Sequence, residues 1–160
     1  LLGGDLCRTL GGTGDERRLY DGTGTLAAVD LGEALVDGRL RLFVAHAVVR
    51  RRPAWRGGVL AAMNAQFLGR YDVAPRAHPG DGLLDVVDVD PDMPVGERWK
   101  AWRRLPSGTH VPHPRISVRR VDAVQLDVPA GARVELDGRG LRPARTLSLR
   151  LEPDAVTVLV

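Results

Sequence analysis

The last third of the sequence constrains the fold most, because short stretches there alternate between apolar and polar residues. These stretches are 116–121, 124–128, 134–137, 147–151 and 156–160, with turn signals at Pro129-Ala130-Gly131 and Asp137-Gly138. A period of two is typical of β-strands that turn one face to a core and the other to water. Short strands at regular spacing predict a mainly β fold, either an antiparallel β-sandwich or a closed antiparallel sheet, with one or two short helices.

Residues 94–105 have the spacing of an amphipathic helix instead, and Asp92 can cap its start. Val95, Trp99 and Trp102 then share one face of this helix. Two tryptophans on one stripe favour packing against the core. A basic helix with tryptophan is also the composition of a membrane-surface element, so both interpretations stay open.

The first half of the chain predicts a hairpin and one buried histidine. Asp37-Gly38 stands between two apolar runs, which is a strong signal for a two-residue hairpin turn. His46 follows on an apolar run without a second histidine or cysteine at ligand spacing. We therefore expect a structural histidine there rather than a metal ligand.

A tight turn in the middle of the chain holds one carboxylate at a corner. The run His78-Pro79-Gly80-Asp81-Gly82 combines the fixed φ of proline with two glycines. The following residues, 83–89, are mostly apolar and β-branched and predict a strand that leaves the turn. Asp81 is therefore expected at the entrance of a strand. A hairpin turn without a ligand is the alternative.

This central stretch resembles the C-terminal domain of the diacylglycerol kinase, sphingosine kinase and bacterial YegS-like lipid kinase family. The family carries Val-Ala-Pro and then Asp-Asp-Gly-Leu-Leu-Asp-Val or close variants. The counterparts here are Val73-Ala74-Pro75 and Gly80-Asp81-Gly82-Leu83-Leu84-Asp85-Val86. The resemblance covers nearly the whole chain. It implies the substrate-side domain of an ATP-dependent lipid kinase that transfers a phosphoryl group to a lipid hydroxyl. The alternative is a non-catalytic lipid- or anion-binding domain descended from that fold.

The start of the chain resembles the segment that closes the nucleotide-binding domain in complete family members. Asp5, Arg8 and their neighbours match the family's Asp-Leu-Ala-Arg-Thr-Leu-Gly, and the same residues predict a short helix. The resemblance assigns 1–25 to the tail of an upstream domain or a linker, and 26–160 to the β domain. It also implies that Asp5 and Arg8 contribute to cofactor binding. We expect ATP to bind mainly to a missing N-terminal domain, and this chain alone to be inactive.

The resemblance further implies a magnesium ion at the central turn. The family places Mg²⁺ on the aspartate that matches Asp81 and on the carbonyls of the residues that match His78 and Leu83. A carboxylate and backbone carbonyls are the hard oxygen ligands that this cation prefers.

The general base of the family is replaced in this chain. The family's Val-Asp-Gly-Glu turn ends in the glutamate that acts on the lipid hydroxyl, and Arg139 occupies that place. Asp137 and Glu135 are the two nearby carboxylates that could take over the role. Loss of catalysis is the alternative.

A basic loop suggests an anionic partner. The chain has a formal net charge of +3 and contains few lysines, so arginine supplies nearly all of its positive charge. We expect the loop, in place of the long helical insertion usual in the family, to contact a lipid headgroup or an anionic membrane surface. A solvated loop is the alternative. The predicted contact residues are Arg50, Arg51, Arg52, Trp55 and Arg56.

Several other classes of protein fit the sequence poorly. The sequence contains no run of about 18 apolar residues, which is the length that a membrane-spanning helix requires. The single cysteine, Cys7, is typical of a protein from a reducing compartment. His110 and His113 lack two further ligands for zinc. We predict a cytoplasmic protein, peripheral at the inner membrane face, that acts on a lipid alcohol. We expect no nucleic-acid partner and allow for a homodimer.

Overall fold

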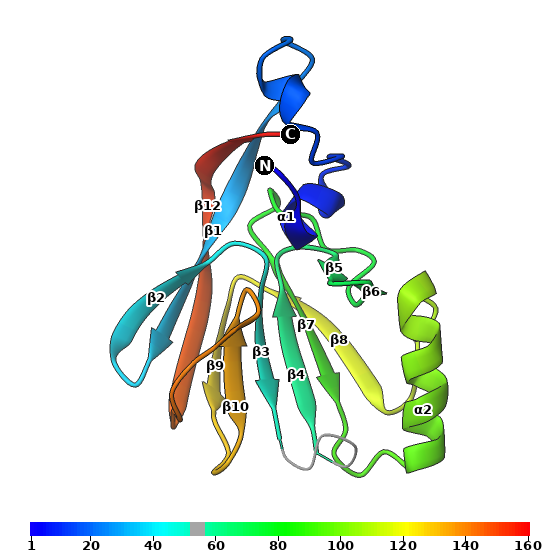
Figure 1. Cartoon of the computed structure of the whole chain (residues 1–160). Helices are drawn as coiled ribbons and strands as arrows, with labels where there is room; N and C mark the ends of the chain where they lie inside the picture. The colour runs from blue at the N-terminus through cyan, green and yellow to red at the C-terminus, as the bar shows by residue number, and fades with distance from the viewer. Residues whose placement is uncertain (52–56) are drawn as a thin grey trace.

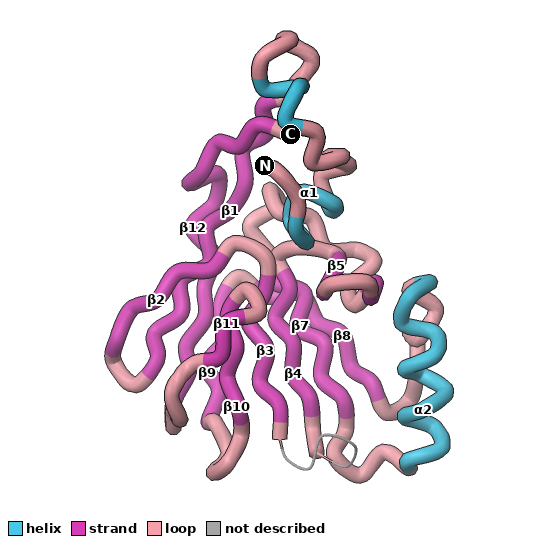
Figure 2. Tube along the Cα trace, in the orientation of Figure 1, coloured by secondary structure: helices cyan, strands magenta, loops and turns pink. Residues whose placement is uncertain are grey.

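The computed structural model describes residues 1–51 and 57–160, and two antiparallel sheets dominate this part of the chain (Figures 1 and 2). The four-stranded sheet has the order β2-β1-β12-β9, with β1 at Leu26–Val36, β2 at Arg39–Phe43, β9 at Ala123–Asp127 and β12 at Thr146–Leu159. The six-stranded sheet has the order β11-β10-β3-β4-β7-β8, with β3 at His46–Arg50, β4 at Val59–Met63, β7 at Leu84–Val89, β8 at Ile116–Val121, β10 at Arg133–Leu136 and β11 at Arg139–Gly140. The packed sheets confirm the mainly β fold and select the sandwich.

Short elements complete the described part of the chain. They are α1 at Gly4–Thr9, the 3₁₀ helices η1 at Glu16–Leu19 and η2 at Leu105–Ser107, the small hairpin of β5 at Phe67–Leu68 and β6 at Tyr71–Asp72, and α2 at Val95–Arg104. Asp37-Gly38 joins β1 to β2 with φ angles of 46° and 78°. Positive φ at both positions is what a two-residue hairpin of this kind needs, so the predicted turn is confirmed.

The main hydrophobic core lies between the two sheets. Alternation along β12 turns Leu147, Leu149 and Leu151 inward, where they join the core cluster. Phe43 packs directly on Gly32 of the neighbouring strand, since a Cβ added to that glycine would lie 2.4 Å from the ring. The period of two thus builds this half of the protein as the sequence predicts.

A second hydrophobic cluster covers the other face of the six-stranded sheet. Val48, Ala61 and Val87 from three neighbouring strands pack against Met93 and Ala101. Because this sheet is buried on both faces, its central strands are nearly continuous apolar runs rather than alternating ones. The fold therefore has three layers, with α2 outside the six-stranded sheet (Figure 1).

Helix α2 is present where predicted, but it buries a different face. Arg98 and Ala101 are its buried residues, whereas Trp99 and Trp102 are 47% and 38% exposed. The Arg98 guanidinium donates to the backbone carbonyl of Gly57 at 2.8 Å and to that of Asp90 at 2.9 Å. These charge-assisted bonds fix the rotation of the helix. Of the two interpretations left open for the tryptophan stripe, the structure does not support packing into the core. The predicted Asp92 cap is wrong, because Pro94 precedes the helix and no side chain caps it.

The last strand is also longer than predicted. Instead of separate strands at 147–151 and 156–160, β12 runs unbroken from Thr146 to Leu159. Its pairing with β1 shifts register beside Pro153, and Asp154 has a φ of 51°. An irregularity of this kind accepts a proline, because no ladder hydrogen bond is required of its nitrogen there.

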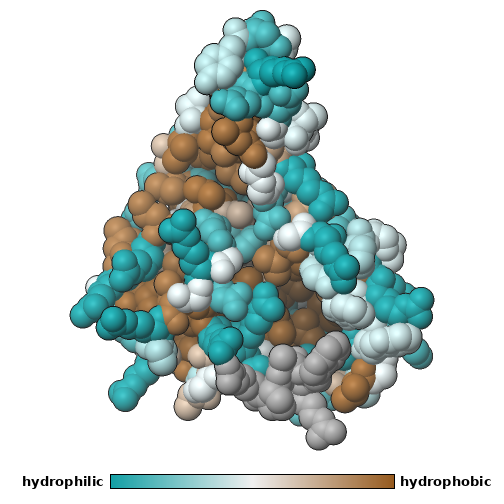
Figure 3. All heavy atoms as spheres, in the orientation of Figure 1, coloured by the Kyte–Doolittle hydropathy of each residue, from teal (hydrophilic) through white to brown (hydrophobic). Residues whose placement is uncertain are grey.

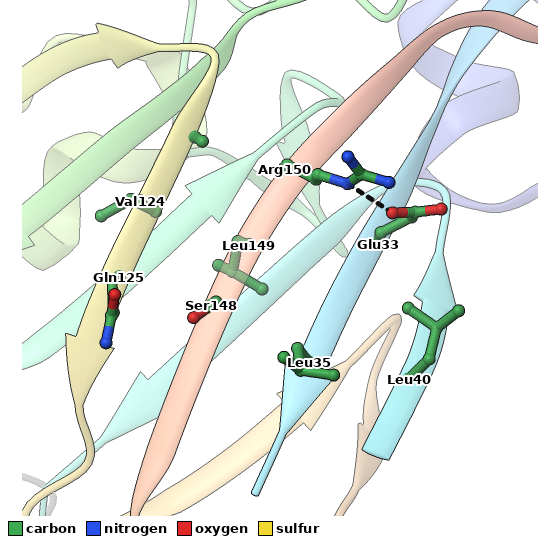
Figure 4. A pocket seen from close by; sticks show the side chains of 9 residues that line it. Glu33, Leu35, Leu40, Val124, Gln125, Ser148, Leu149 and Arg150 are labelled. Carbon is green, nitrogen blue, oxygen red and sulfur yellow. Dashed lines mark hydrogen bonds and ion pairs between the residues drawn. The ribbon is translucent and has the colours of Figure 1, made fainter. Parts of the chain in front are cut away.

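The outer face of the four-stranded sheet carries a hollow of about 580 Å³ (Figure 4). Leu35 of β1 and Leu40 of β2 stand opposite each other there and are 45% and 57% exposed. An ion pair of 2.5 Å between Arg150 Nε and Glu33 Oε2 crosses the strands beside them. None of the predicted site residues that the structure describes lines this hollow.

Candidate functional site

Two of the predicted site residues meet on opposite sides of His46, at one end of the six-stranded sheet. The Asp5 Oδ2 atom of α1 lies 2.9 Å from the His46 Nε2 atom. The Asp137 carboxylate accepts hydrogen bonds from the backbone N–H groups of Val44, Ala45 and His46, at 2.8, 2.9 and 3.0 Å. The structure thus brings together the predicted cofactor-binding Asp5 and the predicted catalytic Asp137. His46 itself is buried, as expected of a structural histidine.

The local backbone explains how Asp137 reaches these donors. Asp137 and Gly138 form the turn between β10 and β11 with φ angles of 46° and 76°. Aspartate is one of the few side chains that tolerate this region, because its short polar side chain can bond to nearby backbone. Both of its oxygens are engaged by backbone N–H groups of the β2–β3 connection. The main visible role of Asp137 is therefore to hold two strands together.

The other two residues of the predicted catalytic turn lie apart from this cluster. Glu135 is half-buried on β10, and its Oε2 atom is 3.5 Å from the Arg50 Nη2 atom. Arg139 lies on β11 and is exposed. The structure therefore pairs the predicted catalytic Glu135 with the predicted lipid-contact Arg50.

Helix α1 uses Asp5 and Arg8 to dock on the small hairpin. The Asp5 Oδ1 atom accepts a hydrogen bond from the Gly69 N–H at 2.9 Å, and Arg8 Nη1 donates to the Gly69 carbonyl at 3.1 Å. The Arg8 guanidinium also lies 3.8 Å above the Phe67 ring. A shallow hollow of about 320 Å³ adjoins these groups and is lined partly by Gly4 and Thr13. Cofactor binding by Asp5 and Arg8 stays a prediction, as does the assignment of the first 25 residues to another domain.

An apolar pocket of about 380 Å³ lies between the six-stranded sheet and α2. Figure 3 shows this region as a brown hollow in the face of the molecule. The lining residues include Val48, Arg50, Val59, Ala61, Tyr71, Val87, Val89, Met93, Ala101, Trp102, Leu105, His110 and Ile116. Burial lowers the pKa of the His110 imidazole, so the ring is neutral at pH 7 and suits an apolar wall. Of the predicted contact residues that the structure describes, Arg50 lines this wall.

The remaining residues of the predicted lipid-contact loop are only partly described. Arg51 is exposed and its N–H donates to the Gly58 carbonyl at 3.0 Å. Arg52, Trp55 and Arg56 lie outside the described residues. Their contact with a lipid stays a prediction.

The Asp81 turn precedes β7 as predicted, but its carboxylate is already occupied. The Asp81 Oδ2 atom contacts the Arg120 guanidinium, and Oδ1 accepts a hydrogen bond from the Leu83 N–H at 3.1 Å. Among the residues that the structure describes, no group of three or more His, Cys, Asp or Glu side chains could hold a metal ion. Arg120 thus supplies the positive charge at Asp81, and this arrangement does not fit a ready Mg²⁺ site. Binding of Mg²⁺ by Asp81, His78 and Leu83 stays a prediction.

Removing the Arg120 charge is expected to expose Asp81 to magnesium. Millimolar Mg²⁺ should then raise the melting temperature of Arg120→Gln more than that of the wild type, since a bound ligand stabilises the folded state. Differential scanning fluorimetry with Mg²⁺ and with Na⁺ at equal ionic strength measures this. Adding Asp81→Asn should cancel the gain. Equal responses of the wild type and Arg120→Gln would show that Arg120 does not compete with a cation.

Sequence reasoning missed the group that holds this turn, which is Asp30. This residue of β1 is fully buried, and its two carboxylate oxygens accept hydrogen bonds from the Gly82 N–H at 2.8 Å and the Asp154 N–H at 3.0 Å. Its own N–H donates to the Pro79 carbonyl at 2.7 Å. Asn64 Nδ2 donates to the Asp30 carbonyl at 3.1 Å. The available signal was a carboxylate inside an apolar strand, which needs partners when it is buried.

Comparison with known proteins decides the family. The model of the YegS C-terminal NAD kinase beta sandwich-like domain matches residues 33–160. The chain belongs to this family. The resemblance of the central turn to this family is therefore confirmed. The match covers most of the β domain of this chain, which we now call the YegS C-terminal domain. No curated protein matches the sequence.

Solved structures share the fold of this YegS C-terminal domain at low sequence identity. A candidate diacylglycerol kinase from Bacillus anthracis strain Sterne has 13% identity and a TM-score of 0.68, with 96% of this chain and 64% of that chain covered. A structure described as a diacylglycerol kinase from the same organism has 14% identity and a TM-score of 0.61, with 96% and 61% covered. The YegS C-terminal domain thus spans less than two thirds of the length of these proteins. Among its described residues, no helix is long and apolar enough to cross a bilayer.

Proposed function

We propose that this chain is the substrate-side domain of an ATP-dependent lipid kinase of the diacylglycerol kinase type. In this function ATP supplies the phosphoryl group, an upstream domain holds most of the nucleotide, and this chain binds a lipid alcohol. The observation that carries the proposal is the apolar pocket between the six-stranded sheet and α2. A lipid chain requires an apolar cavity with a few polar groups at its edge. Membership of the family supports the same assignment.

The polar edge of the pocket suggests which side chain would receive the hydroxyl proton. Arg50 lines the pocket, and Glu135 pairs with it on the neighbouring strand. Asp137 is less suited to the task, because its oxygens already accept backbone hydrogen bonds. In this proposal Glu135 is the general base, a role that typically contributes about 10²- to 10⁴-fold in rate.

The outer face of α2 supports a peripheral position on a membrane. Trp99 is exposed there, and the Arg103 guanidinium lies 4.8 Å above the Trp99 ring, whereas the partly exposed Trp102 lies at the edge of the apolar pocket. Tryptophan and arginine together favour the interface of an anionic leaflet. We assign this face to the inner membrane surface of a cytoplasmic protein. The exposed Leu35 and Leu40 on the opposite side are where we place a homodimer contact.

The alternative function is a lipid or anion binder without catalysis. Arg139 at the place of the family's glutamate favours it, together with the use of Asp137 for backbone hydrogen bonds. A cation cannot accept a proton from the substrate hydroxyl. Both functions require the apolar pocket to take a lipid, so the first experiment tests that shared step.

Filling the pocket should weaken lipid binding. Ala61 of β4 is buried and lines the pocket, so Ala61→Phe should weaken binding of a fluorescent short-chain diacylglycerol at least about tenfold, which is 1.4 kcal/mol. Ala123→Phe, on the exposed outer face of the other sheet, is the matched control. Overpacking costs typically 1–3 kcal/mol, so thermal melts must show that both variants remain folded. Unchanged binding by folded Ala61→Phe would exclude this pocket as the lipid site.

A further inference from the structure

A second hollow, of about 480 Å³, lies beside the apolar pocket and carries charged side chains. The two hollows share Val73 and Ile116 in their walls. In the second one, β7 contributes Asp85 and β8 contributes Arg120, which stand directly opposite each other in the sheet register. The loops 73–76 and 111–113 form the remaining walls. We call this hollow the Asp85 pocket.

The charged groups of the Asp85 pocket are incompletely satisfied. Asp85 is 1% exposed, and its Oδ2 atom has no hydrogen-bond partner among the described residues. The nearest cationic atom is Arg120 Nε at 3.6 Å, which is too far for a hydrogen bond. Arg76, also in the wall, has no hydrogen bond or ion pair with any other described residue. A buried carboxylate oxygen without a donor is costly, so this oxygen indicates a missing partner.

The surroundings of Asp85 define what that partner must offer. Arg120 already pairs with Asp81, so Arg76 is the guanidinium that still requires a negatively charged oxygen acceptor, and arginine is well suited to phosphate oxygens. The Asp85 oxygen requires a donor at the same time. The other titratable side chains nearby are His113, whose Nδ1 accepts from the Arg115 N–H at 3.1 Å, and Asp81 on the far side of Arg120. A positively charged amine would be repelled by the guanidinium groups. A fully deprotonated anion would be repelled by the Asp85 carboxylate, to which it could not donate a hydrogen bond.

A phosphate that retains one proton meets both requirements. We propose that the Asp85 pocket binds a phosphate monoester, with the P–OH group donating to Asp85 and the anionic oxygens accepting from Arg76 and Arg120. Because their second pKa is about 6, phosphate monoesters keep this proton on about one molecule in ten at pH 7, so binding should strengthen as the pH falls towards 6. Sulfate has no proton to donate there and would place an acceptor against Asp85. The pocket should therefore distinguish two anions of nearly equal size.

The adjoining apolar pocket suggests two sources of this group. A phosphorylated lipid could place its chain against α2 and its headgroup at Asp85, whereas a soluble phosphate would use the Asp85 pocket alone. The proposal does not depend on the kinase function, since neither ATP nor phosphoryl transfer enters it. Failure of diacylglycerol binding would leave it intact, and its own failure would leave the diacylglycerol test unaffected.

Isothermal titration calorimetry with sodium phosphate and sodium sulfate at matched ionic strength tests the site. Wild type should bind phosphate at least about tenfold more tightly than sulfate, and Arg76→Gln should weaken phosphate by a similar factor. Arg119→Gln is the matched control, because Arg119 is the neighbour of Arg120 on β8 and is paired with Val86, which faces the main core. Equal binding of phosphate and sulfate, equal loss in both arginine variants, or no phosphate binding in the millimolar range would overturn the proposal.

Two further arms sharpen the result. Asp85→Asn replaces the acceptor by an amide that can donate, so sulfate should now bind at least as well as phosphate; retained preference for phosphate would contradict the role of Asp85. Dihexanoyl phosphatidic acid below its micelle concentration distinguishes the sources. If this lipid binds more tightly than inorganic phosphate, and if Ala61→Phe removes the difference, the ligand is a phosphorylated lipid. If the two bind equally well, the ligand is a soluble phosphate.

Discussion

Replacing Asp30 by alanine is expected to lower the free energy of unfolding by about 3–5 kcal/mol. The variant removes two charge-assisted hydrogen bonds and leaves the N–H groups of Gly82 and Asp154 without their acceptor. Hydrogen bonds to charged groups contribute about 1.5–3 kcal/mol each, and buried donors left unsatisfied cost a comparable amount. Urea unfolding followed by circular dichroism measures the change.

The control for Asp30 is Asp88→Ala. Asp88 also lies on a strand, but its side chain is exposed, so the effect should stay within about 0.5 kcal/mol. Comparable losses in both variants would show that Asp30 does not hold the central turn. A large and specific loss would show that the Asp30 carboxylate holds the Asp81 turn through its bond to Gly82.

Replacing Asp137 by alanine is expected to cost about 2–4 kcal/mol, because three backbone N–H groups lose one shared acceptor. Alanine is also disfavoured at a φ of 46°. Asn is a milder change, since it tolerates this conformation and keeps one oxygen. Thermal unfolding of both variants should rank Ala below Asn below wild type.

This ranking also bears on function. A residue that serves only as a base can be replaced with little loss of stability, whereas Asp137 is expected to be structural. The exposed Asp127 at the end of β9 provides a control, and Asp127→Ala should leave the melting temperature nearly unchanged. If Asp137→Ala is as stable as this control, the hydrogen bonds from the backbone to Asp137 contribute little to the stability of the fold. Asp137 would then again be a candidate general base, together with Glu135.

The strands could be predicted from the sequence because their cause is local. Alternating side chains and the Asp37-Gly38 turn act over a few residues; the alternation over 147–151 and the turn appear where expected, although β12 is longer than the predicted strand. The rotation of α2 could not be predicted in this way. It depends on the carbonyl groups of Gly57 and Asp90, which are contributed by other segments of the chain and lie next to Arg98 only after folding.

In the candidate site, too, local features could be predicted from the sequence and contacts between distant residues could not. Resemblance to the family drew attention to Asp5, Asp81 and Asp137, but their partners are distant in the sequence. Nothing near Asp81 indicates that Arg120 will contact it, and nothing near Asp5 indicates His46. Glu135 was selected for its place in a turn, whereas its contact with Arg50 follows from the pairing of β10 with β3.

Strand β7 lies between two hydrophobic layers, so substitutions on one of its faces affect the core and substitutions on the other face affect the pockets. Leu84 and Val86 face the core between the sheets, whereas Asp85 and Val87 face the two pockets. Neighbouring residues on this strand therefore have different roles, one in packing the core and the other in lining a pocket. Ligand preference can be redesigned at positions 85 and 87 while 84 and 86 keep the sandwich intact. A library randomised only at the two pocket-facing positions should retain a high fraction of folded members.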